Sequence, residues 1–391
     1  MIIRPRIRGY ICTTAHPDGC RSLVNEQIAR ARGQAGKPAA ASQSVLVLGG
    51  SGGYGLASRI DWAFRTGAKT LCLSFEKEPS NDATATAGWY NNQAFDRAAN
   101  ASGLYARSLN ADAFADETKE QVAQIVRDDL GGLDVLIYSL ASPVRKDLDG
   151  TVFRSAIKPI GRSVRLKTLQ VEKGVVHEIE VPPATDEEIY STIKVMGGQD
   201  WERWVAHLQA KHLLNPGFKT VAYTYIGSDL TWPVYWEGTL GKAKEDLDRA
   251  AQTMRGALEQ VSGDARVAVL KAVVTQASSA IPAIPLYVSL LFKVMKEQGV
   301  HEDCLQNVSR LFRSWVAGDG LVETDESGRL RVDDWELRQD IQVEVRRRWT
   351  AAHTDNIMEL SDLGGFRRDF LRIFGFAVDG VDYESEVSPL A

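Results

Sequence analysis

The chain has 391 residues, of which 44% are apolar and 25% are charged, and these shares exclude a long disordered, collagen-like or coiled-coil architecture. It carries 46 Lys and Arg against 51 Asp and Glu, so its net charge of −5 makes nucleic-acid binding a poor hypothesis. Four cysteines are too few for a disulfide framework, no apolar run is long enough to span a membrane, and the first residues lack a signal-peptide core. We expect a cytoplasmic protein without membrane insertion.

Short apolar runs alternate with longer amphipathic segments. Residues 2–12 predict a small hairpin within residues 1–15, residues 36–43 predict a loop, and residues 318–335 predict a loop or a short hairpin. Strands are predicted at 44–48, 70–75, 104–109, 133–140, 220–225 and 267–274, and helices at 55–66, 118–130 and 242–261. Buried strands separated by helices indicate a parallel sheet covered on both faces. We therefore predict an α/β fold with a Rossmann-type, doubly wound parallel sheet, in a single domain over residues 1–391.

A glycine-rich loop follows the first of these strands and opens a helix. It reads Gly-Gly-Ser-Gly-Gly-Tyr-Gly over residues 49–55. Two registers fit, one through Gly50, Gly52 and Gly55 and the other through Gly49, Gly53 and Gly55. Either lets the backbone approach a pyrophosphate at the helix N-terminus. A tight turn without a ligand is the alternative, but the coincidence of strand, helix and a later acid favours dinucleotide binding.

That acid is Glu76, at the end of the second predicted strand and 21 residues after Gly55. A spacing of about 20 is typical of the carboxylate that accepts from the ribose 2′-hydroxyl. A carboxylate there would repel a 2′-phosphate, which favours NADH over NADPH, although Lys77 could blunt the preference. A solvated charge at a strand end is the alternative. Residues 112–113 and 139–143 end later strands and fit the adenine and nicotinamide edges of such a site.

Two tyrosine–lysine pairs could serve a reductase as a proton donor and its cationic partner. Tyr190 and Lys194 have the Tyr-x3-Lys spacing of short-chain dehydrogenases, but they follow an acidic helix start and no strand comes after them, so we interpret them as a surface match. Tyr235 and Lys244 have a Tyr-x8-Lys spacing between a strand and a helix, where α/β enzymes place their chemistry. By spacing alone, this second pair could equally be a packing tyrosine and a solvated lysine.

The chain resembles the FabV-type enoyl-[acyl-carrier-protein] reductases and the closely similar trans-2-enoyl-CoA reductases. The resemblance runs over the whole length and rests on residues 2–20 (IIRPRIRGYICTTAHPDGC), 49–55, 139–143, 273–282 (VVTQASSAIP) and 374–383, and on the Tyr235–Lys244 pair. It implies an enlarged short-chain-dehydrogenase-like fold, NADH dependence and a monomer. The glycine loop departs from the family pattern, because the family carries Ala or Cys at position 50 and Thr or Asn at position 52.

The resemblance also implies roles for individual residues. Tyr235 would be the proton donor, Lys244 its partner and a cofactor ligand, Tyr225 a substrate contact and Glu76 the discriminator of NADH from NADPH. The residues expected to line the cofactor are Gly49, Gly50, Ser51, Gly52, Gly53, Tyr54, Phe75, Glu76, Asp112, Ala113, Leu140, Ala141, Lys244, Val273, Val274 and Thr275. The implied reaction is the NADH-dependent reduction of a trans-2-enoyl thioester, on acyl carrier protein or coenzyme A, to the saturated thioester in the final reductive step of fatty acid elongation.

An apolar segment at residues 277–295 is expected to cover the acyl chain, although a core helix fits it equally well. Pro282 and Pro285 argue against a regular helix before residue 286. His16 with Cys20, and His301 with Cys304, lack the four ligands of a structural zinc site, so no metal is expected. Two other functions stay open: a carbonyl reductase that uses Tyr190 and Lys194, and a non-catalytic NADH-sensing protein.

Overall fold

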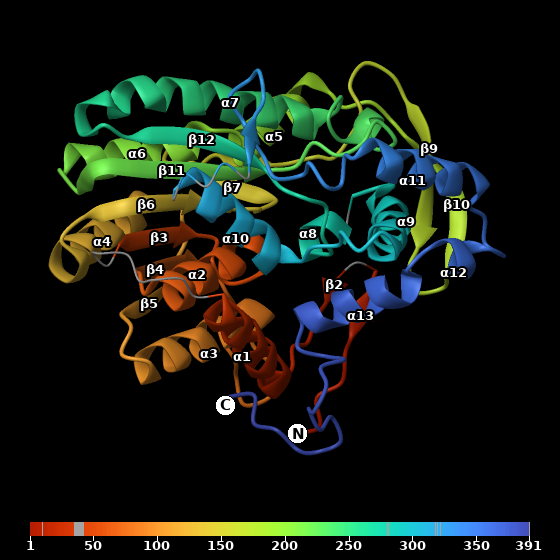
Figure 1. Cartoon of the computed structure of the whole chain (residues 1–391), viewed down its shortest axis with the longest axis horizontal. Coiled ribbons are helices and arrows are strands. Elements are labelled where there is room, and N and C mark those ends of the chain that lie inside the picture. The colour runs from red at the N-terminus through yellow and green to blue at the C-terminus, as the bar shows by residue number, and fades with distance from the viewer. Residues whose placement is uncertain are drawn as a thin grey trace.

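An eight-stranded sheet in the order β13-β14-β12-β11-β6-β3-β4-β5 forms the centre of the computed structural model (Figure 1). The structure describes residues 1–9, 11–34, 43–279, 281–316, 318, 320 and 322–390, so the loop expected at 36–43 lies outside the described residues except for residue 43. The strands are β3 (Ser44–Leu48), β4 (Lys69–Ser74), β5 (Ala106–Asn110), β6 (Leu133–Tyr138), β11 (Leu214–Thr224), β12 (Asp264–Val269), β13 (Glu323–Thr324) and β14 (Leu330–Arg331).

The sheet is parallel from β5 to β14, and only β13 runs antiparallel to its neighbour. From β3 the chain moves outward to β4 and β5, then returns to place β6 on the other side of β3. This reversal of strand order is the mark of a doubly wound sheet, in which ligands bind beyond the carboxyl ends of the strands at the reversal point. The predicted fold class is confirmed.

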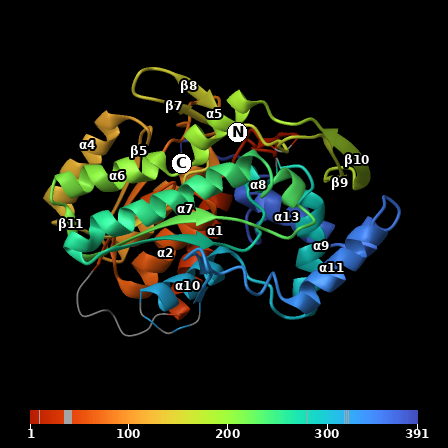
Figure 2. The ribbon, with the colours of Figure 1, turned by 90° about the horizontal axis from the view of Figure 1, so that it is seen from above.

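Helices cover both faces of the sheet (Figure 2). Along β3, Leu46 and Leu48 belong to one apolar core, while Val45 and Val47 belong to the other, as the two-residue period of a strand requires. The first core is closed by α4 (Asp116–Ile125), α6 (Gln199–Ala210) and α7 (Thr239–Leu258), and the second by α1 (Pro17–Gly33), α2 (Gly53–Thr66), α3 (Ala87–Ala101) and α10 (Cys304–Trp315).

A third apolar core is built around α9 (Ile284–Glu297), which follows α8 (Gln276–Ser279) and lies on the right of Figure 1. It packs α9 with α11 (Gln339–Ala351), α12 (Ile357–Leu360), α13 (Leu363–Ile373) and the antiparallel hairpin of β9 (Val164–Gln170) and β10 (Val175–Val181). The two ends of the chain meet, because the Met1 ammonium donates to the Val387 carbonyl at 3.0 Å.

Most predicted elements are found within a few residues of their expected bounds. The N-terminal hairpin is present as β1 (Ile7–Arg8) and β2 (Ile11–Cys12), and the hairpin expected after residue 318 is β13–β14. The remaining elements are β7 (Val144–Lys146), β8 (Val152–Arg154), α5 (Asp186–Met196), the π-turn η1 (Val126–Leu130) and the 3₁₀ turns η2 (Trp232–Val234) and η3 (Glu259–Val261). In the part of the chain that the structure describes, no helix is long and apolar enough to cross a membrane.

Two expectations about element bounds were wrong, and one hairpin was not predicted. The strand predicted to reach residue 274 ends at Val269, after which the chain leaves the sheet. α9 begins at Ile284, before the expected start, because Pro285 occupies the first turn, where a missing N–H costs nothing. The hairpin β9–β10 was not predicted, although its strands alternate apolar and charged residues, as in Val164-Arg165-Leu166-Lys167 and Glu178-Ile179-Glu180-Val181.

Candidate active site

The glycine loop has the geometry of a phosphate cradle between β3 and α2. Gly49 has a φ of 82°, and a Cβ there would lie 2.4 Å from the Ser139 carbonyl oxygen at the end of β6. A Cβ on Gly55 would lie 2.1 Å from the Gly49 carbonyl oxygen, so glycine allows the helix to pack close to the strand. A Cβ on Gly52 would meet no atom within 4 Å, so open space lies beside the N-cap of α2. The first N–H groups of α2 face this opening, and the loop therefore fits a dinucleotide pyrophosphate.

Glu76 lies next to the glycine loop rather than out in solvent. Its Oε1 accepts from the Ser51 hydroxyl at 2.5 Å, and its Oε2 accepts from the hydroxyl of Thr86, the N-cap residue of α3. A Cβ on Gly88 would lie 2.1 Å from Glu76 Oε1, so the glycine makes room for the carboxylate at the helix N-terminus. A carboxylate in this place is stabilised by the helix dipole. Its position beside the loop fits an acceptor for the adenosine ribose.

The other expected cofactor residues end neighbouring strands. Phe75 follows β4 and is 79% exposed, which leaves an aromatic face free beside Glu76. Leu140 and Ala141 follow β6, and the Ser139 N–H donates to the Leu48 carbonyl at 2.9 Å, which ties this loop to the end of β3. Thr275, beyond β12, lies close to the glycine loop, because its Cγ2 would be 3.6 Å from a Cβ on Gly53. The structure therefore brings the segment at residues 273–275 to the cradle.

Two members of the expected cofactor set have side-chain atoms that are engaged elsewhere. The Tyr54 hydroxyl donates to the Lys271 carbonyl at 2.6 Å, and its ring packs edge-on against Tyr223, so the Tyr54 side chain belongs to the core behind the loop. Asp112 Oδ1 accepts from the Phe114 N–H at 2.9 Å and holds the turn after β5. The buried Ala113 accepts from Trp204 at 3.1 Å through its carbonyl. These contacts hold Tyr54, Asp112 and Ala113 in place within the protein.

The Tyr-x8-Lys spacing is explained by a tight turn between η2 and α7. The Tyr235 carbonyl accepts from the Gly241 N–H at 3.0 Å, so the chain folds back onto Tyr235 as α7 begins. Gly241 must be glycine, because a Cβ would lie 1.7 Å from the Trp236 carbonyl oxygen. Lys244 comes three residues after Gly241, which places it on the same face of the helix. The eight intervening residues therefore bring Lys244 back toward the tyrosine.

The two polar groups of this pair are unpaired. In the described residues, neither the Tyr235 hydroxyl nor the Lys244 ammonium has a hydrogen-bond partner. Burial raises the pKa of Tyr235, which keeps the phenol protonated at neutral pH. Burial lowers the pKa of Lys244 to about 8, against the opposing attraction of Asp248. The pair thus offers a phenol proton that no described residue accepts and a lysine whose pKa of about 8 lies close to neutral pH.

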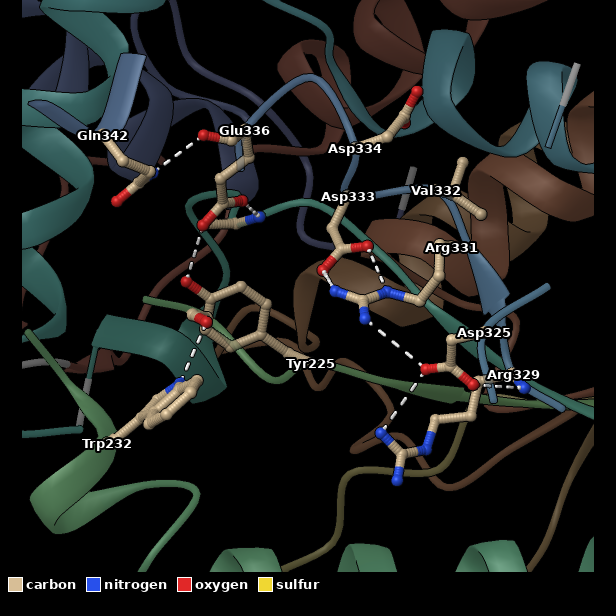
Figure 3. A network of polar contacts seen from close by, with 12 residues as sticks. Tyr225, Trp232, Asp325, Arg329, Arg331, Val332, Asp333, Asp334, Glu336 and Gln342 are labelled. Carbon is tan, nitrogen blue, oxygen red and sulfur yellow. Dashed lines mark hydrogen bonds and ion pairs between the residues drawn. The ribbon is translucent and has the colours of Figure 1, made fainter. Parts of the chain in front are cut away.

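Tyr225 is joined to a buried carboxylate that the sequence did not reveal. Its ring packs edge-on against Tyr235, with 5.3 Å between centroids, and its hydroxyl donates to Glu336 Oε1 at 2.9 Å (Figure 3). Glu336 is fully buried in the segment between β14 and α11. It also accepts from the Tyr287 hydroxyl of α9 at 2.8 Å. No local sequence signal distinguishes Glu336 from the neighbouring acids Asp333 and Asp334.

The competing pair lies on a surface helix. Tyr190 belongs to α5 and is 54% exposed. Its ring packs edge-on against Phe153 of β8, and the Lys194 ammonium lies 5.4 Å from the ring centroid. A lysine above a tyrosine ring is a cation–π contact and does not polarise the hydroxyl. Tyr190 has the Tyr-x3-Lys spacing without the geometry of a proton donor.

The apolar segment at residues 277–295 contains most of the core helix α9, which begins at Ile284. Residues 284–292 of α9 are all buried. Ile281 and Ile284 belong to the same apolar cluster as Tyr235 and Leu240, so the start of α9 supplies apolar surface next to the tyrosine. A separate cavity of about 270 Å³ is lined by Val234, Leu230, Trp349 and residues of β9, none of which belongs to the expected cofactor set. Among the described residues, no cluster of three or more His, Cys, Asp or Glu could hold a metal ion.

Three protein-family models match the chain. Residues 2–81 match the NAD(P)H binding domain of trans-2-enoyl-CoA reductase, residues 83–316 match its catalytic region, and residues 324–387 match an enoyl reductase FAD binding domain. The last stretch does not fit a flavin. Its helices pack their apolar faces into the third core, and the arginines of α11 are engaged in ion pairs, such as Arg348 with Glu297 at 2.6 Å. We derive no step through a flavin.

Relatives match over the full length. The enoyl-[acyl-carrier-protein] reductase [NADH] FabV of Aeromonas salmonicida is 53% identical over 100% of this chain and 98% of its own. The enoyl-[acyl-carrier-protein] reductase [NADH] of Edwardsiella ictaluri is 52% identical with the same coverage. The crystal structure of Treponema denticola trans-2-enoyl-CoA reductase in complex with NAD has a TM-score of 0.94 at 45% identity and covers 99% of this chain and 98% of that one. Given these matches and the site at the sheet reversal, the chain belongs to the family of FabV-type enoyl-[acyl-carrier-protein] reductases and trans-2-enoyl-CoA reductases.

Proposed function

We propose that the protein is an NADH-dependent reductase that converts trans-2-enoyl thioesters to saturated acyl thioesters, the final reductive step of fatty acid elongation. The observation that carries the proposal is the buried Tyr235, whose hydroxyl has no hydrogen-bond partner among the described residues. Its carbonyl accepts from the N–H of Gly241, which lies one helical turn before Lys244 in α7. The relatives that match over the full length are named as enoyl reductases that use NADH.

NADH, held by the glycine loop, Glu76 and residues 273–275, would supply a hydride to the β-carbon of the thioester. Negative charge then develops on the thioester oxygen. In our proposal the Tyr235 hydroxyl donates a hydrogen bond or a proton to that oxygen. The enolate or enol then gains a proton at its α-carbon, so that the double bond has taken up one hydride and one proton and the thioester is saturated. The Lys244 ammonium holds the ribose and keeps a positive charge near the developing enolate.

The surroundings of Tyr235 support this role. Tyr235 is 6% exposed and lies in an apolar cluster with Leu240, Ile281 and Ile284. In such a site a hydrogen bond to a developing oxyanion is worth more than in water, because little solvent competes for it. The raised pKa of Tyr235 keeps its proton in place until the oxyanion forms. The same apolar side chains would accommodate the alkyl part of the substrate.

The carrier of the thioester can be acyl carrier protein, coenzyme A or both. The Aeromonas salmonicida relative is named for acyl carrier protein, and the Treponema denticola structure is named for coenzyme A. We propose that both carriers are accepted, since the Tyr235–Lys244 chemistry acts at the carbonyl end, which the two share. Comparing kcat/KM for the same acyl chain on each carrier measures the preference.

The decisive experiment follows NADH oxidation by the purified protein with crotonyl-CoA and, in parallel, with a 3-ketoacyl-CoA. Rapid oxidation with crotonyl-CoA alone supports the proposal. Activity with the ketoacyl substrate alone would assign the protein to the carbonyl reductases. Binding of NADH without turnover of either substrate would leave an NADH-sensing role.

We further propose that the chain acts as one catalytic unit, as a monomer, in the cytoplasm. The first point is supported by the sheet, because β3 and β4 lie within the matched NAD(P)H-binding stretch while β5, β6, β11 and β12 lie within the matched catalytic region. Separate expression of residues 1–81 should therefore give no stable fold. Light scattering of the purified chain tests the monomer, and subcellular fractionation tests the location.

A further inference from the structure

Glu336 is a fully buried carboxylate that accepts three hydrogen bonds from three different elements. Its Oε1 accepts from the hydroxyls of Tyr225, after β11, and Tyr287, on α9, at 2.9 and 2.8 Å. Its Oε2 accepts from the backbone N–H of Ala272, after β12, at 2.7 Å (Figure 3). A buried carboxylate is costly unless hydrogen bonds and charges compensate it, so its place beside the candidate active site calls for a physical role.

The polar contacts of the Glu336 carboxylate all suit a hydrogen-bond acceptor. All three contacts to its carboxylate are hydrogen-bond donors, and the nearby Lys271 is 2% exposed and attracts the negative charge. Burial raises the pKa of Glu336, while Lys271 and these donors oppose that rise. An ionised carboxylate can only accept hydrogen bonds. In both tyrosine contacts the phenol is the donor and the carboxylate oxygen is the acceptor.

This fixes the direction of the Tyr225 hydroxyl. A phenol has a single proton, and that of Tyr225 is directed at Glu336, so toward a substrate its oxygen can only accept. The ring of Tyr235 lies edge-on to that of Tyr225 at 5.3 Å, and its hydroxyl has no partner in the described residues. The two tyrosine rings are thus in contact, and among the described residues only the Tyr235 hydroxyl has no acceptor for its proton.

We propose that Glu336 is a positioning residue that decides which tyrosine donates to the substrate: it holds the Tyr225 proton away from the thioester oxygen and leaves Tyr235 as the donor. The inference rests on the proposed function and adds a residue to it. Glu336 touches neither substrate nor cofactor in this scheme and acts through Tyr225.

Glu336→Gln tests the proposal because it keeps the size of the side chain and changes its hydrogen-bonding capacity. If the new amide N–H₂ faces the tyrosines, it donates to Tyr225 and releases the Tyr225 proton. If it faces Ala272 instead, it opposes another donor, a pairing that costs free energy and loosens the contact. The first orientation is therefore preferred, and in it residue 336 no longer accepts the Tyr225 proton.

The experiment measures the cost of Tyr235→Phe in two backgrounds, with steady-state kinetics on crotonyl-CoA and NADH affinity from fluorescence. In the wild type, Tyr235→Phe should lower kcat by roughly 10²–10⁴-fold. In the Glu336→Gln background its cost should be smaller by about tenfold, because the released Tyr225 proton partly replaces the missing one and the two changes are coupled. Adding Tyr225→Phe to the double variant should abolish that relief. The Kd for NADH should stay the same throughout.

Asp333→Asn is the matched control for loss of a buried charge in the same segment. Asp333 is 1% exposed, pairs with Arg331 at 2.7 Å and, among the described residues, makes no hydrogen bond to Tyr225 or Tyr235 (Figure 3). It should lower Tm without changing the cost of Tyr235→Phe. Should Glu336→Gln fail to fold, Glu336→Asp withdraws the carboxylate by one methylene, and the same direction of effect is expected.

The proposal is overturned if Tyr235→Phe costs the same in the Glu336→Gln and wild-type backgrounds, or if Glu336→Gln and Asp333→Asn behave alike. It is also overturned if the relief persists without the Tyr225 hydroxyl. A wild-type protein that oxidises no NADH with crotonyl-CoA would instead refute the proposed function, so the two failures are distinguishable.

Discussion

Ser51 and Glu76 are joined by a hydrogen bond of 2.5 Å that links the centre of the glycine loop to the end of the neighbouring strand. The contact places a carboxylate beside the open N-terminus of α2 before any cofactor is bound. Because Glu76 also accepts from Thr86 at the N-terminus of α3, the carboxylate is oriented by two elements that pack on the same sheet. An oriented acceptor loses less conformational entropy when a ribose hydroxyl arrives.

Glu76→Ala should narrow the preference for NADH over NADPH. The change removes the acceptor for the ribose diol and the repulsion of a 2′-phosphate, so kcat/KM should fall for NADH and rise for NADPH. Glu78→Ala, which removes an exposed carboxylate two residues away, is the control and should leave the ratio unchanged. A wild-type protein that uses both cofactors equally well would contradict this role of Glu76.

Gly52 and Gly55 have different surroundings in the glycine loop, and substitutions at the two positions should therefore have opposite effects on stability. Gly52 has extended backbone, with φ of −161°, and open space around its Cβ position, so Gly52→Thr should raise the free energy of unfolding by about 0.5–1 kcal/mol through loss of unfolded-state entropy, with NADH binding intact. Gly55→Ala should lower both stability and NADH affinity, because its Cβ would strike the Gly49 carbonyl. Thermal unfolding and NADH titration measure both, and equal behaviour of the two variants would refute this view of the loop.

The parts of the fold that local patterns encode were predictable. The continuous apolar run of β3 and the following helix gave the centre of the sheet, because side chains buried on both faces leave an unbroken hydrophobic stretch. The spacing from Gly55 to Glu76 identified a carboxylate that the structure indeed places at the loop. In contrast, the roles of Tyr235, Lys244 and Tyr225 came from the family resemblance and remain predictions.

The remaining features depend on contacts between distant residues. Glu336 lies 111 positions from Tyr225, and no periodicity or motif connects them. The Tyr-x8-Lys spacing could not be derived either, because it depends on the backbone hydrogen bond from Gly241 to Tyr235. The hairpin β9–β10 is a different case, because its strands carry a local signal: apolar and charged residues alternate in Val164–Lys167 and in Glu178–Val181, and the pattern was missed.

The pKa of Lys244 predicts an alkaline limit to activity. Burial lowers that pKa to about 8, so the lysine is charged below this pH and neutral above it. If the charge holds the ribose and stabilises the enolate, kcat/KM for NADH should be full at lower pH and fall as the pH rises through about 8. Lys244→Arg stays charged at every accessible pH, so its kcat/KM for NADH should not fall as the pH rises through about 8, even if its activity is lower than that of the wild type. Lys242→Met is the control, since Lys242 is exposed and pairs with Glu245. A profile that stays flat up to about pH 10, where an ordinary lysine titrates, would contradict the role.

Tyr190→Phe and Tyr235→Phe form a matched pair, because each removes one hydroxyl and keeps the ring. Tyr190 is 54% exposed on α5, so its substitution should leave turnover nearly unchanged. Tyr235→Phe should retain the fold and NADH binding but lower kcat by roughly 10²–10⁴-fold, since the developing oxyanion loses its donor. Lys244→Met should weaken NADH binding and turnover together.

The combination of Tyr235→Phe with Lys244→Met tests whether the two residues work as a unit. If Lys244 acts through the charge that Tyr235 helps to stabilise, the double variant should cost much less than the product of the single losses in kcat. Multiplicative losses would keep both residues important and refute the coupling. A large loss from Tyr190→Phe, on the order of a hundredfold, together with a silent Tyr235→Phe would move the reaction to the Tyr190–Lys194 pair, and the short-chain carbonyl reductase would then replace the enoyl reductase as the better account of this protein.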